Sequence, residues 1–506
     1  MDMKLSDWIE KYWVHIIMII GGLNLLYRFV DESQLFHRFP LDFTNDISAY
    51  MAQLHFLKVC GFNNFCPYWY NGFVNLVMSQ PGWYFFAYPL YLMLGSVTAA
   101  AYISMILLFI IAFFAVQYLG KEINLDKTKR IAFYILFFAN ASVIGGVIRN
   151  GRQHFMLNLI LLIIFFSIIW SYKDRKLNAF FFTSSVVYSL MLVTHYQETV
   201  LAALFFLCLF VYKKSVKEKL IVISSFLLSF LLASWWLIYF VREISTSSLL
   251  AFHEGKRVFL FNKEVILTNL LAFIIPITLL IIFYVYYKRK QDERREIIFF
   301  LPVIALCILY LTRISTLIPI LRNISQVPYM MFFLLFILLI FFKEEKLFMQ
   351  DRIWKIFIPT GIVLLVVLSV VTNMVHTPFF IQPTPLDDDI IKLFQYVDGR
   401  FILIGPLERN GYPMSYSKPL YSYASIYYNL STPDGWSPPL ASLDYQLRLD
   451  DFYKHIAKKE CDEIRDELRF FNTTNIITMN QRCEMLIKCG FKEIKAVKDV
   501  CLYKIE

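Results

Sequence analysis

The chain of 506 residues is 58% hydrophobic and 17% charged, whereas an ordinary soluble domain is nearer ~45–50% apolar and ~25% charged. Its mean hydropathy is +0.55. These values exclude an ordinary soluble domain and predict a polytopic α-helical membrane protein. The formal charge of +10 does not indicate a nucleic-acid partner, because the Lys and Arg residues fall in short clusters between apolar segments rather than along one face.

The N-terminal stretch "MDMKLSDWIEKYWVH" leads into the first apolar segment, and no small-residue cleavage site follows that segment. We therefore expect the first crossing to stay in the mature protein. Counting segments able to span ~30 Å of hydrocarbon predicts about eleven transmembrane helices. They lie near 13–30, 97–118, 131–148, 156–172, 179–194, 199–212, 219–241, 265–287, 297–312, 329–342 and 356–374.

Loops between these segments alternate in charge. Five of them are basic: "KEINLDKTKR", "KDRK", "KKSVKEK", "KRKQDERRE" and "KEEKLFMQDRIWK". All five fall on one side of the membrane if the helices alternate in direction, and the positive-inside rule makes that side cytoplasmic. The sequence therefore predicts a multi-pass protein of the cell membrane with a cytoplasmic N-terminus and an extracytoplasmic C-terminus.

The segment 79–95, "SQPGWYFFAYPLYLMLG", is apolar enough to span the membrane. A crossing there would place every later basic loop on the outer side. We therefore expect an interfacial or re-entrant helix broken by Pro81 and Pro89, with its Trp and Tyr residues at the headgroup level.

The predicted architecture has two parts. Residues 1–374 form the transmembrane domain, with a long first outer loop at 31–96, and residues 375–506 form an extracytoplasmic α/β domain. In the second part "RFILIGPL" and "TNIITM" are typical of buried strands, "LDDFYKHIAKKECDEIRDELRFF" and "QRCEMLIKCG" of helices, and the last sixteen residues of a pair of strands.

Six of the eight cysteines lie in segments predicted to be outside the membrane. They are Cys60 and Cys66 in the first outer loop, and Cys461, Cys483, Cys489 and Cys501 in the C-terminal domain. An even number in an oxidising compartment is compatible with disulfides, of which Cys60 to Cys66 is the simplest, whereas reduced structural cysteines remain the alternative.

Two acids lie early in the first outer loop, shortly after the first crossing. Asp42 and Asp46 lie four residues apart in "PLDFTNDISAYM" and would face the same way on a helix. A carboxylate at the outer face can accept a proton from an attacking hydroxyl group or help to hold a divalent cation such as Mg or Mn. The alternative is a helix cap, with Asn45 or Asp46 preceding a helix that begins at Ile47.

A second polar cluster is "RNGRQHF", which places Arg149, Arg152 and His154 between the third and fourth crossings. Guanidinium groups suit phosphate oxygens, and these two arginines lie on the side that is otherwise poor in basic residues. Anchoring to lipid headgroups is the alternative.

A third cluster, "THYQET", places His195, Gln197 and Glu198 where the fifth predicted helix ends and the sixth begins. A charged side chain is costly at the bilayer centre, so an acid here indicates a surface or wet-cavity position. A ligand-binding or acid/base role is one interpretation, and a tight turn is the other. The sequence contains no Walker A loop, G-x-S-x-G or H-E-x-x-H motif.

In this order, the features resemble the GT-C superfamily of membrane glycosyltransferases, which take sugars from polyprenyl-phosphate donors. The resemblance rests on one crossing, a long outer loop with an early Asp, the aromatic stretch "PYWYNGF", and the Pro-led segment 79–95 before the second crossing. "WYNGF", "TPDGW" and the C-terminal stretch from residue 472 are most similar to the multispanning proteins labelled 6-pyruvoyl-tetrahydropterin-synthase-related, a label that implies no pterin chemistry.

The resemblance implies an inverting glycosyltransferase that moves a sugar from a polyprenyl-phosphate donor to a lipid, glycan or protein acceptor on the outer face. It implies that Asp46 is the catalytic base, with Asp42 second. Candidate substrate-binding residues are Arg149, Arg152, His154, His195, Gln197, Glu198, Trp69 and Tyr70, the last two by stacking on sugar rings. The chain lacks the WWDYG-like motif of oligosaccharyltransferases. The alternative function is a non-enzymatic translocator of lipid-linked glycans or a membrane scaffold.

Overall fold

The computed structural model describes residues 5–41, 46–244, 266–289, 294–349, 352–377, 379–405, 408–409, 412–413, 418–436 and 440–505. The chain divides into two compact units. Unit 1 comprises Met1–Glu32, Met105–Leu237 and Gly255–Pro378, and unit 2 comprises Ser33–Ser104, Ile238–Glu254 and Phe379–Glu506.

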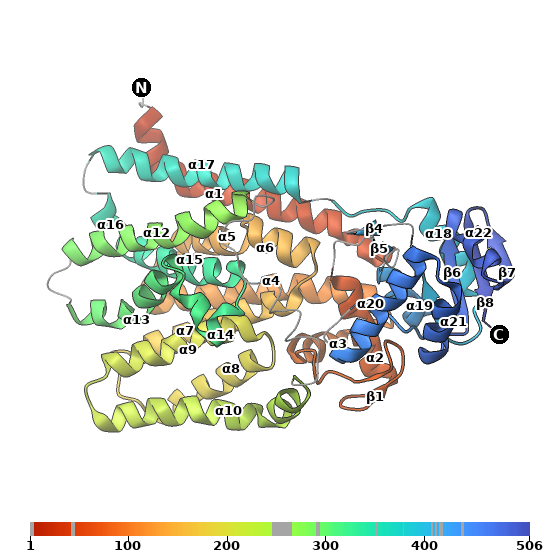
Figure 1. The fold of residues 1–506 in the computed structure, drawn as a ribbon. Coiled ribbons are helices and arrows are strands. Elements are labelled where there is room, and N and C mark those ends of the chain that lie inside the picture. Colours follow the sequence, from red (N-terminus) through yellow and green to blue (C-terminus); the bar gives the residue numbers. More distant parts are fainter. Residues whose placement is uncertain are drawn as a thin grey trace. The chain divides into compact units, whose positions relative to one another are not determined.

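Unit 1 consists of long apolar helices that run alongside one another (Figure 1). These are α1 (Leu5–Glu32), most of α4 (Val97–Glu122), α5 (Lys127–Phe138), α7 (Gln153–Tyr172), α8 (Thr183–Leu192), α9 (Tyr196–Tyr212), most of α10 (Val216–Ile244), α12 (Ile266–Arg289), α13 (Arg294–Leu311), α15 (Gln326–Lys343) and α17 (Arg352–His376). Short elements between them are α6 (Ala141–Val143), η2 (Ile144–Arg149), η3 (Ala179–Phe182), η6 (Ile314–Leu317), α14 (Pro319–Arg322) and α16 (Glu345–Phe348).

The polytopic helical fold is confirmed, since every predicted apolar segment coincides with a helix or a pair of helices. Within the described residues, seven helices are long and apolar enough to cross a membrane, and an eighth span results if the bent pair at 127–149 counts as one. The predicted number, about eleven, is larger for two reasons. Two of the predicted spans, η3 with α8 and the single helix α9, are shorter apolar helices. A third, α13, begins with the charged residues Arg294, Arg295 and Glu296.

The bend within 127–149 has a side-chain cause. Asn140 follows the end of α5, and its Oδ1 accepts hydrogen bonds from the main-chain N–H groups of Ser142 and Val143 at 3.0 and 3.1 Å. Its Nδ2 donates to the carbonyl oxygen of Phe137 at 2.7 Å. Asn140 therefore ends one helix and caps the next, and the two parts meet at 49°.

The five basic loops gather at one end of unit 1, as their alternation predicts. Lys129 of the first forms an ion pair with Glu345 of the fifth, Arg175 of the second lies 3.6 Å from Glu122 of the first, and Lys213 Nζ of the third donates to the carbonyl oxygen of Arg175 at 2.5 Å. Glu296 of the fourth loop joins Lys173 and Lys343 at 3.7 and 2.5 Å. Charge patterning thus identified one end of the helical unit.

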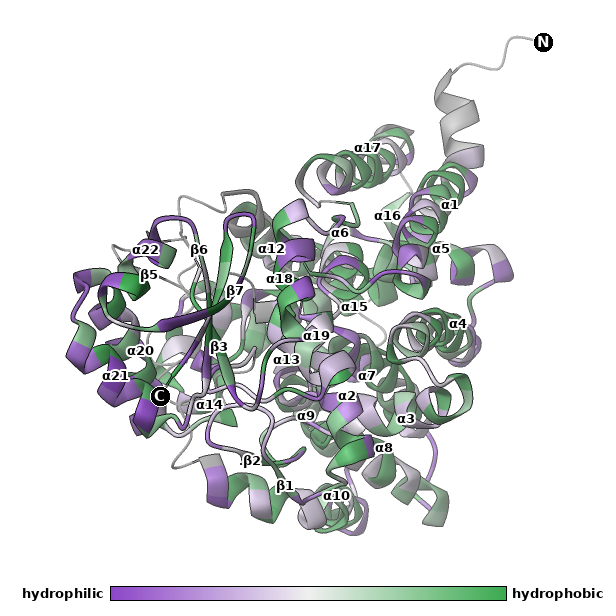
Figure 2. Cartoon of the chain, turned by 90° about the vertical axis from the view of Figure 1, so that its right-hand side faces the viewer, coloured by the Kyte–Doolittle hydropathy of each residue, from purple (hydrophilic) through white to green (hydrophobic). Residues whose placement is uncertain are grey.

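Unit 2 combines the first inter-helix segment with the C-terminal part of the chain. The former supplies η1 (Ser33–Phe36), α2 (Ile47–Val59), β1 (Phe65–Cys66), β2 (Phe73–Val74) and α3 (Gly82–Leu94). The latter supplies α18 (Pro385–Phe394), β3 (Phe401–Leu403), β4 (Glu408–Arg409), β5 (Tyr412–Pro413), α19 (Lys418–Tyr428), α20 (Leu443–Lys458), α21 (Cys461–Phe470), β6 (Asn475–Met479), α22 (Gln481–Lys488), β7 (Lys492–Val497) and β8 (Val500–Lys504). Figure 2 shows α21 and α22 with mixed hydrophilic and hydrophobic colours, as expected of helices with one buried face.

The central sheet of unit 2 has the strand order β3-β6-β8-β7. β3 pairs parallel with β6, whereas β8 is antiparallel to both β6 and β7. The predicted strands and closing hairpin are confirmed. The prediction of a single helix over 449–471 is wrong. Lys459 has a left-handed backbone conformation with φ of 63°, which ends α20, and α21 is a separate helix.

The segment 79–95 forms the helix α3, which ends at Gly95 in the left-handed conformation. Its 13 residues extend over about 20 Å, too short for a bilayer crossing. The helix begins directly after Pro81, in agreement with the prediction. The predicted break at Pro89 is wrong, because Pro89 lies inside the helix.

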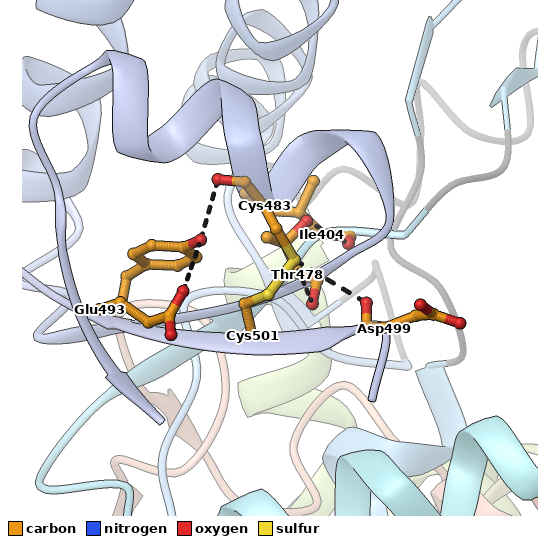
Figure 3. Close-up of a disulfide and its surroundings, with 7 residues drawn as sticks. Ile404, Thr478, Cys483, Glu493, Asp499 and Cys501 are labelled. Atoms are coloured by element: carbon orange, nitrogen blue, oxygen red, sulfur yellow. Dashed lines mark hydrogen bonds between the residues drawn. A yellow bond between two sulfur atoms is a disulfide. The ribbon is translucent and has the colours of Figure 1, made fainter. Parts of the chain in front are cut away.

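Three disulfides cross-link unit 2: Cys60 to Cys66, Cys461 to Cys489, and Cys483 to Cys501. Figure 3 shows the third, which ties α22 to β8. Tyr503 Oη donates a hydrogen bond to the carbonyl oxygen of Cys483 at 2.8 Å. The six cysteines predicted to lie outside the membrane are therefore all paired, whereas Cys208 and Cys307, in helices of unit 1, are free.

Candidate functional site

The predicted site residues belong to different units. Arg149, Arg152, His154, His195, Gln197 and Glu198 lie in unit 1, and Asp46, Trp69 and Tyr70 lie in unit 2. Asp42 lies outside the described residues.

All the unit 1 candidates lie at the end opposite the basic loops. Alternation of the helices places the C-terminal ends of α1, η2, α8 and α17 at this end, together with the N-terminal ends of α7, α9 and α15. Packing supports this placement, since η2 contacts α1, α6 and α7. We call this end of unit 1 the polar end.

Arg149 is the last residue of η2, a six-residue π-helical turn. The main-chain N–H of Asn150 donates to the carbonyl oxygen of Gly145 at 3.0 Å, which is the i to i−5 bond of a π-helix. Such turns are rare and concentrate at functional sites. Arg149 is only 2% exposed. A guanidinium buried among apolar helices is costly, and such residues in membrane proteins are functional candidates.

A second buried arginine, Arg28 of α1, belongs to the same region. It interacts electrostatically with Arg149, Asp31 and Glu32. Its guanidinium also donates hydrogen bonds to the carbonyl oxygens of Asn373 and Thr377, the latter at 3.0 Å. Arg28 therefore caps the C-terminal end of α17. Sequence reasoning missed Arg28 because it was counted as part of the first crossing, although an arginine within an apolar segment was the available signal.

His195, Glu198 and Asn158 form a second cluster at the polar end. His195 precedes the first residue of α9, and its Nδ1 is hydrogen-bonded to Glu198 Oε2. Asn158 of α7 places its Nδ2 2.6 Å from the carbonyl oxygen of His195 and 3.2 Å from Glu198 Oε2. The ring of Phe155 meets the imidazole edge to face at 6.2 Å. The imidazole is thus fixed in position by two helices.

The two charged members of this cluster differ in exposure. The Glu198 side chain is 1% exposed, whereas the His195 side chain is 23% exposed. Within the part of the chain that is described, Glu198 Oε1 and Asn158 Oδ1 are buried and have no hydrogen-bond partner. A buried polar oxygen left unsatisfied costs ~1–3 kcal/mol. The cluster therefore has two buried oxygens that can accept further hydrogen bonds beside a partly exposed imidazole, as expected of a site that receives a ligand.

The remaining unit 1 candidates surround these two clusters. His154 lies one turn before Asn158 on α7 and is buried, whereas Arg152 is exposed. Gln197 Oε1 accepts hydrogen bonds from the N–H and hydroxyl groups of Ser325 at 3.1 and 2.7 Å. Gln197 therefore ties α9 to the start of α15, which is a structural contact.

Asp46 occupies the N-cap position of α2. Its carbonyl oxygen accepts hydrogen bonds from the N–H groups of Ala49 and Tyr50 at 3.1 and 3.2 Å. The carboxylate makes no capping hydrogen bond and is half-buried. The cap interpretation therefore describes the backbone of Asp46 but not its side chain, which lies at the positive end of a 13-residue helix.

Trp69 and Tyr70 are fully buried in the core of unit 2. They pack against Gly435, where an added Cβ would lie 3.0 Å from Trp69 Cγ and 3.0 Å from Tyr70 Cζ. The N–H of Thr432 donates to the carbonyl oxygen of Tyr68 at 2.8 Å. The motifs "WYNGF" and "TPDGW" therefore bind each other. The predicted stacking of sugars on Trp69 and Tyr70 does not agree with this structure, because neither ring has an open face.

Among the described residues, no three His, Cys, Asp or Glu side chains gather closely enough to hold an ion. The expected Mg or Mn stays a prediction.

Comparison with solved structures gives matches along almost the whole chain. The cryo-EM structure of the arabinofuranosyltransferase AftD from Mycobacteria has a TM-score of 0.57 at 12% identity, over 97% of this chain and 40% of that one. The apo oligosaccharyltransferase of Archaeoglobus fulgidus has a TM-score of 0.62 at 10% identity, over 99% and 75%. The oligosaccharyltransferase AglB from Archaeoglobus fulgidus, in complex with an inhibitory peptide and a dolichol-phosphate, has a TM-score of 0.58 at 10% identity, over 93% and 70%.

This chain spans 40% of the length of AftD. No protein-family model matches the sequence, and no curated protein matches it significantly. The finer resemblance to the 6-pyruvoyl-tetrahydropterin-synthase-related proteins stays a prediction. The structural matches establish that the chain has a GT-C-like fold.

Proposed function

We propose that the protein is an integral membrane glycosyltransferase that moves a sugar from a polyprenyl-phosphate donor to a hydroxyl-bearing acceptor. The observation that carries this proposal is the polar end of unit 1. There the carboxylate of Glu198, which is 1% exposed, retains an oxygen with no partner among the described residues, in a fold similar to those of AftD and AglB. The sugar of such a donor carries hydroxyl groups, which can donate hydrogen bonds to this carboxylate.

In this proposal Arg149 and Arg152 stabilise the departing lipid phosphate, because guanidinium groups match phosphate oxygens in charge and geometry. His195, oriented by Glu198 and Asn158, binds the sugar or transfers a proton. A partly exposed imidazole held by a buried carboxylate suits either task. His154 is a further candidate binding residue, and the structure adds Asn158 to the set, whereas the amide of Gln197 is used in the contact with Ser325.

Asp46 is the proposed catalytic base, with Asp42 as the second candidate. Its half-buried carboxylate is not used for helix capping. In the proposed step this carboxylate accepts the proton of an acceptor hydroxyl group while that oxygen attacks the anomeric carbon. The bond to the lipid phosphate breaks in the same step, which inverts the configuration.

The proposed orientation places unit 2 and the C-terminus on the extracytoplasmic side. The basic loops at the other end of unit 1 support it through the positive-inside rule. The three disulfides of unit 2 support it independently, because disulfides persist in oxidising compartments.

The test is sugar transfer by the purified protein in detergent with a panel of polyprenyl-phosphate sugars. We expect turnover by the wild type and a loss of at least about 100-fold, the size expected of a general base, in Asp46→Asn. The matched control is Asp444→Asn, which removes another acid from the first turn of a unit 2 helix. Equal activity of all three proteins would remove Asp46 from the mechanism, and failure to consume any donor would favour a glycan translocator or scaffold.

A further inference from the structure

A cleft in unit 2 concentrates positive charge that the proposed transfer reaction does not use. It lies between α21 and the strands β7 and β8, with a volume of about 210 Å³. Its lining contains four cationic side chains, Arg465, Arg469, Lys492 and Lys504, and no acidic one. Gly490 contributes to the remaining surface.

Regular secondary structure holds these charges in pairs. Arg465 and Arg469 lie four residues apart on α21, so they share one helix face. Lys492 and Lys504 are direct cross-strand partners in β7 and β8. Both arrangements place like charges side by side, which destabilises a helix or a sheet unless an anion compensates.

Arg465 is held at a fixed position in the cleft. Its guanidinium donates a hydrogen bond to the carbonyl oxygen of Cys489, and its Cζ lies 5.5 Å from the centroid of the Phe491 ring. Cys489 is joined by a disulfide to Cys461, the first residue of α21. The covalent link fixes the two walls of the cleft relative to each other, so the site is organised before any ligand binds.

Neighbouring acids compensate only part of this charge. Arg469 lies 3.5 Å from Asp466, with side chains 67% and 74% exposed, and Lys504 lies 4.0 Å from Asp398, with side chains 52% and 90% exposed. Such exposed pairs are weak. In the described parts of unit 2, no acid lies within ion-pair distance of Arg465 or Lys492.

We propose that this cleft binds a phosphate group. Two guanidinium groups can engage phosphate oxygens in bidentate fashion, and two ammonium groups supply further charge. A tetrahedral oxyanion would relieve both repulsive pairs at once. The phosphate could belong to a glycan or to a lipid headgroup, and the two sources are separable by experiment.

The test is isothermal titration calorimetry on the full-length, disulfide-intact protein with inorganic phosphate, against sodium chloride at matched ionic strength. We expect saturable binding by the wild type and at least tenfold weaker binding by the double variant Lys492→Gln/Lys504→Gln. The control Lys488→Gln/Lys495→Gln removes the same charge from exposed positions outside the cleft and should bind like the wild type. A Lys492→Arg/Lys504→Arg variant should retain binding.

Equal weakening in the cleft variant and in the control would overturn the proposal, as would absence of saturable heat in the wild type. Glucose 1-phosphate and dihexanoylphosphatidic acid then distinguish the sources: tighter binding of the sugar phosphate supports a glycan ligand, and tighter binding of the lipid supports a headgroup. Sugar transfer is not measured in this experiment, so its outcome is independent of the proposed glycosyltransferase activity.

Discussion

The side-chain amide of Asn158 on α7 lies 3.2 Å from Glu198 Oε2 on α9, and it thereby connects two helices at the polar end of unit 1. Asn158 also lies 2.6 Å from the carbonyl oxygen of His195. One amide therefore positions both the carboxylate and the residue that carries the imidazole. Removal of this amide should therefore affect both groups.

Replacing Asn158 by Ala should lower the free energy of unfolding by about 1–3 kcal/mol, because a buried carboxylate oxygen loses a donor. The rate of sugar transfer per folded molecule should also fall, since the His195 imidazole is no longer fixed in position. Thermal unfolding and turnover of the same preparation check this. Loss of stability with unchanged turnover per folded molecule would reduce Asn158 to a structural residue.

The contact between "WYNGF" and "TPDGW" predicts that Gly435→Ala destabilises unit 2. The added methyl group would lie 3.0 Å from atoms of both Trp69 and Tyr70, so these two buried rings must move by a few tenths of an ångström, at an expected cost of about 1–3 kcal/mol. Gly361→Ala is the control, because nothing lies within 4 Å of its added Cβ. Limited proteolysis of unit 2 should distinguish the two variants, and equal resistance would contradict the packing.

The disulfides predict a definite pattern of thiol labelling. Alkylation of the denatured, unreduced protein should modify Cys208 and Cys307 and leave the six cysteines of unit 2 unmodified, as their three pairings require. Peptide mass spectrometry reads this out. Loss of the Cys461 to Cys489 link, which closes a separation of 28 residues, should cost about 3–4 kcal/mol by the loop-entropy relation. Labelling of any unit 2 cysteine would contradict its pairing.

His55 of α2 predicts pH-dependent stability in unit 2. Burial, with a contribution from Lys58, lowers the pKa of His55 below its usual 6.5. The folded state therefore favours the neutral ring, so its stabilising contribution is complete above about pH 6.5 and is lost as the pH falls through the lowered folded pKa. Between pH 8 and pH 5, His55→Gln should show a shallower fall in Tm than the wild type. Parallel curves would refute the assignment.

Sequence patterns predicted the helical segments and the end at which the basic loops gather, because apolar length and Lys and Arg clusters are local properties. The break at Lys459 was missed, because the amphipathic pattern continues across one left-handed residue.

The site was less predictable. Burial of Trp69 and Tyr70 depends on Gly435, which is more than 350 residues away in the chain, and no local pattern shows such a contact. The role of Asn158 could not be predicted, because a single amide within an apolar helix does not indicate which residues it contacts. Arg28 was detectable as an arginine within an apolar segment, but it was counted as part of the first crossing.

The most direct test of the proposed function is release of polyprenyl phosphate from its sugar donor, measured for the purified wild type and for Glu198→Gln and Glu218→Gln. Both glutamates lie in the first turn of a helix, but Glu218 belongs to the basic-loop end. We predict release by the wild type and by Glu218→Gln within twofold of each other, and a rate at least about 100-fold lower for folded Glu198→Gln, beyond the loss of one ordinary hydrogen bond. Equal rates in all three proteins would contradict a donor site at the polar end of unit 1.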